Sequence, residues 1–275
     1  MATGELTMNR PALPGVRGVP IFMYHVLTGA SEPAGAESGA KYRLSAAVFR
    51  EHLALIERHG FQSALVGRLW AQHDSPGGHP AVGVTFDDGD VSNYTLAYPT
   101  LVEAGARADF FVNTATVGRP GFLSWPQIAE MQGAGLSFQS HSHDHVVLVG
   151  LPAAALERQL RDSKRLLEDR LGAPVDFLAA PYGLLNRSVV RAAREAGYRA
   201  VGTSWNWPAR PGAKTMSRIA VYRTTTAVDF SQLLHGRPSI LVRRMGRALL
   251  AHIPKRVMLR VRPSWLGVQV RETGR

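Results

Sequence analysis

The chain of 275 residues contains no cysteine, which excludes disulfide bonds, thiolate metal ligands and thiol nucleophiles. It also lacks any run of about 20 apolar residues, so no membrane-spanning helix is predicted. The N-terminal residues have no charged start followed by an apolar stretch, and therefore no secretory leader is recognised. The absence of cysteine does not fix the compartment, but the missing leader leads us to expect a cytoplasmic protein.

Acidic residues are nearly absent from residues 237–275. This segment has ten Arg and Lys residues against one acid, and it carries nine of the eleven net positive charges. Within it, residues 240–253 place apolar side chains at every fourth position, with Arg243, Arg244 and Arg247 off that stripe. The pattern is typical of a basic helix at the inner face of an anionic membrane. A helix packed on the protein is an equal alternative, and no motif points to nucleic acid.

Apolar runs alternate with amphipathic, helix-like segments through most of the chain. This alternation predicts an α/β fold with a parallel sheet, and seven such units predict a barrel. We expect a disordered lead-in at 1–18, the barrel at 19–236 and a basic extension at 237–275. The predicted strands are 19–26, 81–86, 108–113, 136–141, 177–183, 198–203 and 218–223, and the predicted helices are one capped by Ser45 and those at 98–105, 124–135, 151–172 and 188–197.

One predicted strand, in VTFDDG, ends in two adjacent carboxylates, Asp87 and Asp88. In parallel α/β folds the ligand binds at the carboxyl ends of the strands, so polar residues there are candidates for a site. Two adjacent carboxylates repel each other and raise one pKa unless a cation neutralises them. Asp-Gly is also a common turn signal, which leaves a structural role open.

Three histidines fall within five residues, HSHDH at 141–145, directly after another predicted strand. In a helical turn, His141 and His145 would share one face and reach one ion, while His143 would point elsewhere. With one aspartate they would form a set of two histidines and a carboxylate that leaves positions open for water and substrate. One Asp would then bind the metal and the other would act on the water.

Taken together, TFDDG (85–89), HSHDH (141–145) and APYGLLN (180–186) resemble the motifs of the polysaccharide deacetylase family, carbohydrate esterase family four. The resemblance covers about residues 19–235. It implies a deformed (β/α) barrel of seven parallel strands and a divalent metal, usually zinc, with cobalt or nickel as alternatives. It also implies removal of N-acetyl groups from an amino-sugar polysaccharide or a lipid-linked glycan.

The family's first two motifs assign roles to four residues of this chain. The first motif makes Asp87 the general base and Asp88 a metal ligand. The second motif makes His141 and His145 the other two ligands. These roles are implied by the resemblance and agree with the chemistry of the residue types.

The third motif falls on Pro181 and Tyr182, and the Tyr182 backbone N–H would help to hold the oxyanion. The common form of the family has an arginine shortly before this proline, which orients the base. This chain has alanines at 179–180 instead. Arg218 or Arg223 is a candidate replacement, and the sequence alone does not choose between them.

The family's acid is usually a late histidine in a Leu-x-His motif, but His235 follows a helix-like stretch rather than a strand. The Met-Tyr-His at the first predicted strand resembles the branch that acts on β-1,6-linked N-acetylglucosamine polymers, which makes His25 the preferred acid. Pro181 and Trp205 are candidates for contacting the sugar, with an ordinary packed aromatic as the alternative for Trp205.

Two other functions remain open from the sequence. The same machinery would serve an O-acetyl esterase or a deformylase acting on a glycan. A glycan-binding protein that has lost turnover is the alternative from another class, and the missing arginine is its only support.

Overall fold

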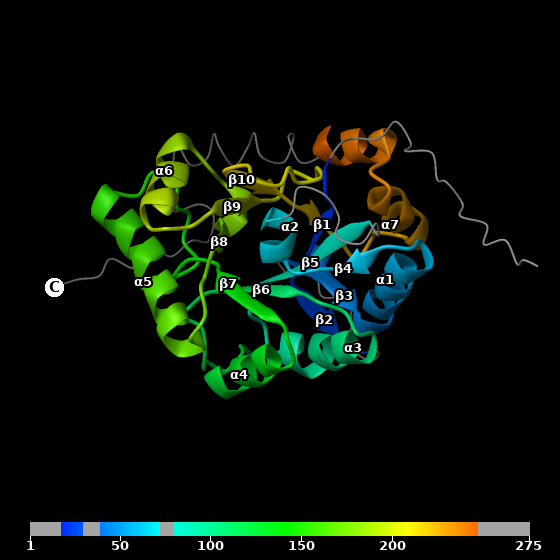
Figure 1. Ribbon diagram of the computed structural model, residues 1–275, viewed down its shortest axis with the longest axis horizontal. Coiled ribbons are helices and arrows are strands. Elements are labelled where there is room, and N and C mark those ends of the chain that lie inside the picture. Colours follow the sequence, from blue (N-terminus) through cyan, green and yellow to red (C-terminus); the bar gives the residue numbers. More distant parts are fainter. Residues whose placement is uncertain (1–17, 30–38, 72–79, 247–275) are drawn as a thin grey trace, which may run out of the picture.

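The computed structural model describes residues 18–29, 39–71 and 80–246 (Figure 1). The expected lead-in lies outside these residues except for its last one, as does the basic extension beyond residue 246. Eleven strands are present in the described part of the chain. They are β1 (Ile21–Tyr24), β2 (Val26–Thr28), β3 (Arg43–Ser45), β4 (Gln62–Ser63), β5 (Ala81–Asp88), β6 (Asp109–Val112), β7 (Ser137–Ser140), β8 (Phe177–Ala179), β9 (Ala200–Thr203), β10 (Thr215–Ser217) and β11 (Ile219–Ala220).

A parallel, barrel-like sheet forms the centre of the molecule. Its strand order is β10-β9-β8-β7-β6-β5-β1-β11, with β4 beside β5, and β2 and β3 form a separate parallel pair. The α/β fold and the deformed parallel barrel predicted from the sequence are confirmed. The predicted strand at 177–183 is shorter than expected, because Pro181–Gly183 forms a 3-10 turn after β8.

A single segment joins the two edges of the sheet. β10 pairs with β9, and β11 pairs with β1, where Phe22 is level with Ile219. Only Arg218 separates the end of β10 from the start of β11. The barrel is therefore nearly closed by residues 215–220, and Arg218 lies where this segment crosses from one edge to the other.

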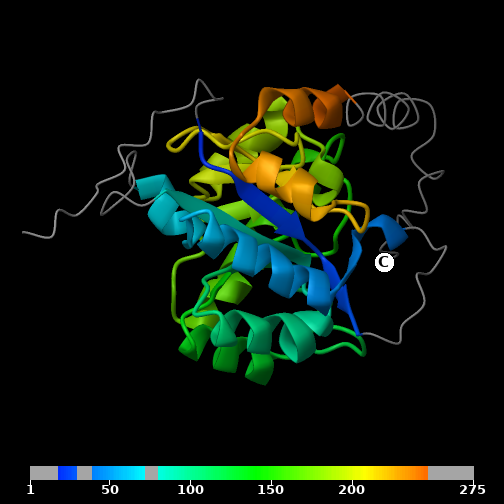
Figure 2. The same cartoon turned by 90° about the vertical axis from the view of Figure 1, so that its right-hand side faces the viewer.

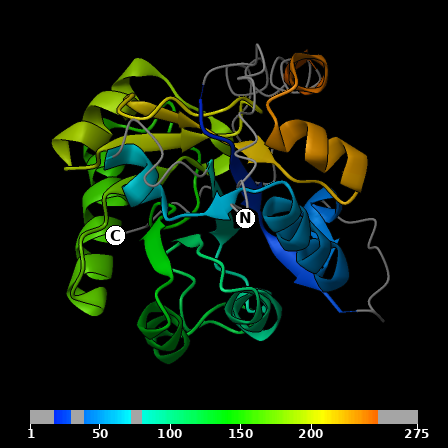
Figure 3. The ribbon, with the colours of Figure 1, turned by 45° about the vertical axis from the view of Figure 1, so that its right-hand side comes forward.

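Helices surround the sheet, as Figures 1 and 3 show from two directions. Ser45 caps the first helix as predicted, because its Oγ accepts a hydrogen bond from the Val48 N–H. In Figure 2, α1 (Ala46–Arg58) and α7 (Ala227–Leu234) lie side by side over β1. The helices are α1 (Ala46–Arg58), α2 (Val66–Ala71), α3 (Tyr98–Glu103), α4 (Trp125–Gly133), α5 (Ala153–Leu171), α6 (Arg187–Glu195) and α7 (Ala227–Leu234).

An aromatic ladder on the helix-covered side of the sheet fixes which residues face inward. Its members come from four neighbouring strands and stack with ring centroids 5.1–5.4 Å apart. Successive side chains in a strand point to opposite faces. The residue that follows the ladder in β5, Asp87, therefore points into the barrel. The ladder consists of Tyr24, Phe86, Phe110 and Phe138.

A smaller apolar cluster fills the barrel interior, and α2 covers it at the end where the strands begin (Figure 1). Trp70 of α2 packs edge-on against Phe177, with ring centroids 5.9 Å apart. The carboxylate of Asp109 accepts a 2.8 Å hydrogen bond from the Val66 N–H, the first residue of α2. This helix was not predicted, because it is short and depends on these contacts. The described residues thus fill this end of the barrel, and the polar strand ends lie at the other.

The helix that precedes the basic extension packs on the barrel. Residues 238–246 are helical, and Leu241 is fully buried. Arg244 is also buried, and it donates hydrogen bonds to the Ala220 carbonyl and to Thr225 Oγ1, both 2.7 Å long. The prediction that Arg244 lies off the packed stripe is therefore wrong.

The rest of the expected membrane helix, residues 247–253, lies outside the described part of the chain. Within that part, no helix has both the length and the apolar character needed to cross a bilayer. Because Leu241 and Arg244 are buried, the described helical residues 238–246 favour the alternative of a helix packed on the protein.

Candidate metal centre

Three of the expected ligands meet at the carboxyl ends of β5 and β7. Asp88 Oδ1 lies 3.3 Å from His141 Nε2 and 3.3 Å from His145 Nε2. Among the described residues, this is the one group of three or more His, Asp or Glu side chains whose ligand atoms lie within 4.8 Å of one another. The sequence predicted all three members.

The distances suit one small divalent cation. Metal–ligand bonds of about 2.0–2.2 Å in a tetrahedral arrangement place two ligand atoms about 3.3 Å apart. Asp88 Oδ1 is buried and has no hydrogen-bond partner in the part of the chain that the structure describes. It is therefore a buried acceptor that faces two imidazole nitrogens and lacks a partner of its own.

The orientation of His141 supports the same conclusion. Its Nδ1 lies 2.9 Å from the Ala179 carbonyl oxygen, which can only accept, so Nδ1 carries a proton and donates. In the neutral ring Nε2 is then unprotonated, and its lone pair faces the Asp88 carboxylate. A histidine that donates its other ring N–H to a backbone carbonyl is typical of metal ligands. A divalent cation between the two acceptors would remove their repulsion.

Electrostatics favour a cation here as well. Burial alone would raise the pKa of Asp88, but its contacts with His141 and His145 and the nearby His25 lower that pKa well below its ordinary value. Burial lowers the pKa of His141, whereas Asp87 and Asp88 raise it, and overall it is above the ordinary value. The two carboxylates thus make this end of the barrel attractive to positive charge.

The loop that carries the histidines is not helical, so the predicted helical turn is wrong. Ser142 and His145 both adopt left-handed backbone conformations, with φ of 67° and 56°. These residues turn the chain back on itself and bring the rings of His141 and His145 to 4.9 Å between centroids. His143 points elsewhere, as expected, and its Nδ1 lies 2.7 Å from Thr114 Oγ1.

α5 holds this loop in place through a residue that the sequence reasoning missed. Gln159 Oε1 accepts hydrogen bonds from the backbone N–H groups of His143 and Asp144, at 3.1 and 3.0 Å. Its Nε2 donates to Asp144 Oδ2 at 2.8 Å. One turn further along α5, Ser163 Oγ lies 2.9 Å from Ser140 Oγ, directly before His141. The only sequence signal was a glutamine on a long helix, which carries no positional information.

The neighbouring Asp87 has a different partner. Arg218 Nη1 and Nη2 donate to the two carboxylate oxygens of Asp87 at 2.6 and 2.7 Å, and both side chains are almost completely buried. The Arg218 guanidinium also lies over the Phe111 ring, 5.0 Å from its centroid. Of the two arginines considered from the sequence, Arg218 contacts Asp87, whereas Arg223 is exposed.

Arg218 also decides the charge state of Asp87. Burial alone would raise the pKa of this carboxyl. Arg218, together with His141 and His25, more than offsets that effect and holds the pKa below its ordinary value. Asp87 is therefore ionised at neutral pH and is held in one orientation by a two-point contact.

The backbone explains how two adjacent acids serve one site. Asp87 points into the barrel toward Arg218, whereas Asp88 has a left-handed φ of 74° that turns its carboxylate toward the histidines. Gly89 follows with φ of 70°, and a Cβ there would lie 3.1 Å from the Val112 side chain. Asp87, Asp88 and Gly89 thus form a turn and also contribute to the candidate metal centre. From the sequence alone these two roles were alternatives.

His25 lies beside both acids. Tyr24 is level with Phe86 in the parallel ladder, which places His25 next to Asp87. Its ring stacks on Tyr42 at 4.2 Å between centroids, and its buried Nδ1 has no hydrogen-bond partner among the described residues. Burial lowers the pKa of His25, Asp88 and Asp87 raise it, and the result is below its ordinary value.

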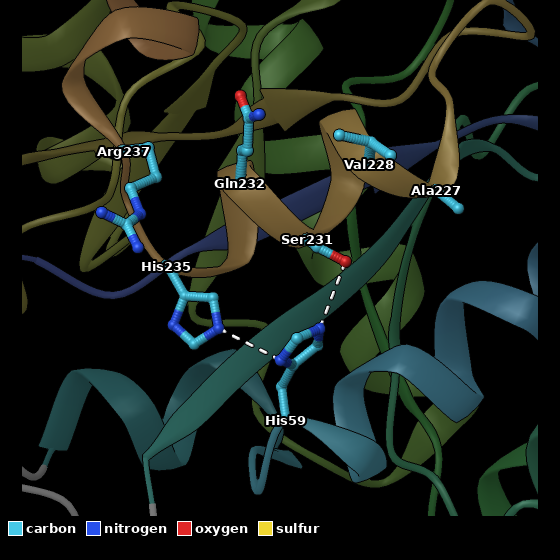
Figure 4. A pocket seen from close by; sticks show the side chains of 7 residues that line it. All are labelled: His59, Ala227, Val228, Ser231, Gln232, His235 and Arg237. Atoms are coloured by element: carbon cyan, nitrogen blue, oxygen red, sulfur yellow. Dashed lines mark hydrogen bonds between the residues drawn. The ribbon is translucent and has the colours of Figure 1, made fainter. Parts of the chain in front are cut away.

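His235, the other histidine considered as an acid, lies in a hollow of about 430 Å³ between α1 and α7 (Figure 4). Its Nε2 is 3.2 Å from Nδ1 of His59, whose Nε2 is 3.2 Å from Ser231 Oγ. His59 precedes β4, which pairs with the first residues of β5. Asp87 is the last but one residue of β5, and six residues at about 3.3 Å each place it roughly 20 Å from the start of that strand, away from His235.

The third motif forms the rim beside the histidines. Pro181 is buried, and Tyr182 adopts a left-handed conformation with φ of 60°. The Tyr182 ring lies 4.9 Å from the ring of His145, and about two fifths of the residue is exposed. Trp205 is half-buried after β9, one residue before Asn206. Tyr182 therefore contacts the metal-ligand group directly, and Trp205 occupies the same end of the barrel.

Comparison with known proteins agrees with these motifs. The sequence profile of the family "Polysaccharide deacetylase" matches residues 74–201. The chain belongs to the polysaccharide deacetylase family. The family match contains Asp87, both ligand histidines and the third motif, whereas His25 and Arg218 lie outside it.

Two curated bacterial proteins are similar to this chain. The chain is 30% identical to YxkH of Bacillus subtilis, provisionally named a polysaccharide deacetylase, over 66% of this chain and 62% of that protein. It is 26% identical to the poly-β-1,6-N-acetyl-D-glucosamine N-deacetylase of Staphylococcus epidermidis, over 59% of this chain and 62% of that protein. The chain thus spans less than two thirds of the length of these curated relatives.

A solved structure shares the fold over most of its length. The Streptococcus pyogenes deacetylase PplD, solved in complex with acetate, superposes with a TM-score of 0.72 at 25% identity. The superposition covers 80% of this chain and 99% of that one. The barrel described here is therefore the family barrel.

Proposed function

We propose that this protein is a metal-dependent hydrolase that removes N-acetyl groups from an amino-sugar glycan. The observation that carries the proposal is that two neighbouring acids, Asp87 and Asp88, have different partners. Asp88 joins two histidines in a group that fits a divalent cation, while Asp87 is held apart from them by Arg218 and stays ionised. A ligand and a free base on one strand end are what amide hydrolysis by water requires.

A divalent cation held by Asp88, His141 and His145 would polarise the acetamide carbonyl and lower the pKa of a water molecule toward neutrality. Zinc suits this set of two imidazoles and one carboxylate, with cobalt or nickel as alternatives. The remaining chemistry falls to residues of this chain.

Asp87 would accept a proton from the attacking water, whose oxygen forms a bond to the acetamide carbon. The Tyr182 backbone N–H would donate to the oxygen that becomes negatively charged, a contribution of about 3 kcal/mol for a well-placed donor. His25 would give a proton to the nitrogen as the carbon–nitrogen bond breaks. The products are acetate and a free amine. The enzyme is restored when Asp87 loses the proton that it accepted and His25 takes up a proton to replace the one that it gave.

The substrate class follows from the family and its relatives. The Staphylococcus epidermidis relative is named for poly-β-1,6-N-acetyl-D-glucosamine, and its name motivates acetylated glucosamine polymers as the first substrates to test. Pro181 and Trp205 stand at the rim where a sugar ring would lie. The missing arginine, the only support for a protein without turnover, no longer counts in its favour, because Arg218 contacts the base.

Acetate release tests the proposal. The zinc-loaded protein is expected to release acetate from N-acetylglucosamine oligomers, with an equal amount of new amine. Matched O-acetylated and N-formylated sugars separate the esterase and deformylase alternatives, which would release acid from those substrates at a higher kcat/KM. Binding of oligomers without release of any acid, at full metal occupancy, would refute turnover.

A further inference from the structure

A second concave surface, about 730 Å³ in volume, lies between α6 and the start of β10. We call it the α6 groove, and Figure 1 shows these two elements side by side. It begins at Leu185 and Asn186, directly after the turn that carries Tyr182, whose ring contacts His145. The groove is thus continuous in the chain with the rim of the candidate metal centre.

The charge of the α6 groove is strongly unbalanced. One acid, Glu195, lines it, and this carboxylate already pairs with Arg191 at 3.8 Å. Its other charged lining residues are all basic, and they come from both walls. They are Arg187, Arg191 and Arg194 from α6 and Lys214 from the residue before β10.

Helix stability does not explain these arginines. They recur at positions 187, 191 and 194, so they share one exposed face of α6, while Val189 and Ala193 are buried on the other. Like charges at this spacing repel each other. Arg187 is also the first residue of α6, where a positive charge opposes the helix dipole. Arg191 gains a pair with Glu195, and Arg194 suits the last turn of α6, but neither effect accounts for Arg187 or for three arginines on one face. The pattern as a whole therefore fits a ligand better than it fits the fold.

We propose that the α6 groove binds a negatively charged stretch of the glycan whose acetylated sugar occupies the metal centre. The inference rests on the proposed function and narrows its substrate to glycans that carry carboxylate or phosphate groups. Arg187 and Arg194 are seven residues apart, about 10 Å along the helix, which gives an extended chain several contact points.

A glycan fits the groove better than a membrane does. The surface is concave, and its first lining residue, Leu185, is close in the chain to Tyr182 of the rim, whereas a bilayer needs a convex surface with exposed apolar side chains. The apolar residues of α6 face the core instead, with Val189 and Ala193 buried. Arginine also binds carboxylate and phosphate through two parallel hydrogen bonds, which suits discrete anionic groups.

The test compares two variants of equal charge. The groove variant carries Arg187→Gln, Arg191→Gln and Arg194→Gln. The control variant carries three substitutions on α1 and α2, outside the α6 groove, and loses the same net charge. The control substitutions are Arg50→Gln, Arg58→Gln and Arg68→Gln, all at exposed positions.

The probes are an N-acetylglucosamine hexamer and its O-carboxymethylated and O-phosphorylated derivatives, measured by calorimetry at low salt. We expect the unmodified protein and the control variant to bind at least one charged hexamer roughly tenfold more tightly than the neutral one, and the groove variant to lose this preference. The tighter of the two charged hexamers identifies the anionic group.

Two results would overturn the inference. One is equal affinity of the unmodified protein for neutral and charged hexamers, and the other is an equal loss in both variants. Co-sedimentation with phosphatidylglycerol vesicles that depends on the groove arginines, without preference among hexamers, would assign the groove to a membrane instead. Acetate release from the neutral hexamer is scored separately, because its absence counts against the proposed function and not against the groove.

Discussion

Arg218 and Asp87 are 131 residues apart in the chain, yet their side chains form two hydrogen bonds of 2.6 and 2.7 Å inside the barrel. Both charges are removed from water, which is costly for an ion without a partner. The contact offsets that cost for both residues and leaves Asp87 ionised beside the candidate metal centre. This pair supplies what the third motif lacks, since alanines occupy positions 179–180.

Removing the arginine should therefore destabilise the protein as well as inactivate it. Arg218→Met leaves the Asp87 carboxylate buried without its partner, and we expect the free energy of unfolding to fall by about 3–5 kcal/mol in urea titrations. Adding Asp87→Asn to that variant should restore much of the loss, because no charge is then left unpaired. Arg223→Met, at an exposed position, is the control and should change stability by less than about 0.5 kcal/mol. Equal effects of the two single substitutions would contradict the role given to Arg218.

The two aspartates should separate metal binding from turnover. Asp87→Asn keeps all three ligands, so zinc content measured by elemental analysis should stay near one ion per chain while acetate release is abolished. Asp88→Asn and His141→Ala each remove a ligand and should lose zinc and activity together. Wild-type turnover in Asp87→Asn, or full zinc occupancy in Asp88→Asn, would reverse the assignment.

Gln159 should set metal affinity without touching the metal. Gln159→Leu removes the acceptor for the His143 and Asp144 N–H groups and frees the loop that carries the two ligand histidines. Loss of such a supporting contact typically weakens metal binding by about 10–100-fold. Calorimetric titration with zinc measures this, and Gln132→Leu is the control, since Gln132 bonds the Leu171 carbonyl instead. Identical zinc affinities for the two variants would show that the loop holds its shape unaided.

The buried Asp109 should make stability depend on pH. Burial raises the pKa of Asp109 to about 7, with hydrogen bonds from Val66 and Ser137 opposing the shift. Because the folded state holds this proton more tightly than the unfolded state, the contribution of Asp109 to stability falls as pH rises from about 4 to 7. Asp109→Asn removes this dependence while keeping an acceptor for Val66.

Urea unfolding at several pH values between 4 and 8 checks the Asp109 prediction. As pH rises, the unfolding free energy of wild type should fall steadily relative to that of Asp109→Asn, and this difference should level off above about pH 7. Asp162→Asn, at an exposed position of α5, should run parallel to wild type. A constant difference for Asp109→Asn across this range would mean that its carboxyl titrates normally.

The residues that finish strands were predictable from the sequence. Asp88 ends β5 and His141 directly follows β7, as the sequence predicted, and in a parallel sheet such ends share one edge. Tyr182 lies in the turn after β8 rather than in the strand. Local composition fixes where a strand ends, so the sequence gives the membership of the metal-ligand group directly.

Contacts between distant elements were not predictable. Arg218 stands in an ordinary strand-like stretch, and only barrel closure brings it to Asp87. The histidine spacing suggested a helical turn, but Gln159 on α5 stabilises a left-handed loop in its place. Arg244 lies off the apolar stripe and is nevertheless buried, because Ala220 and Thr225 accept hydrogen bonds from it. No periodicity in the sequence reveals these partners. In each case the deciding partner is far away in the chain.

The position of Arg218 in the segment that joins β9 to β1 has a consequence for biogenesis. During synthesis, residues 21–203 emerge before the guanidinium that keeps Asp87 charged and aimed. A growing polypeptide that has not yet closed the barrel contains Asp88, His141 and His145 but lacks the arginine that orients Asp87. If Asp87 is the base, closing the barrel at residues 215–220 and completing the catalytic group are one event, so damage at this segment would affect stability and turnover together.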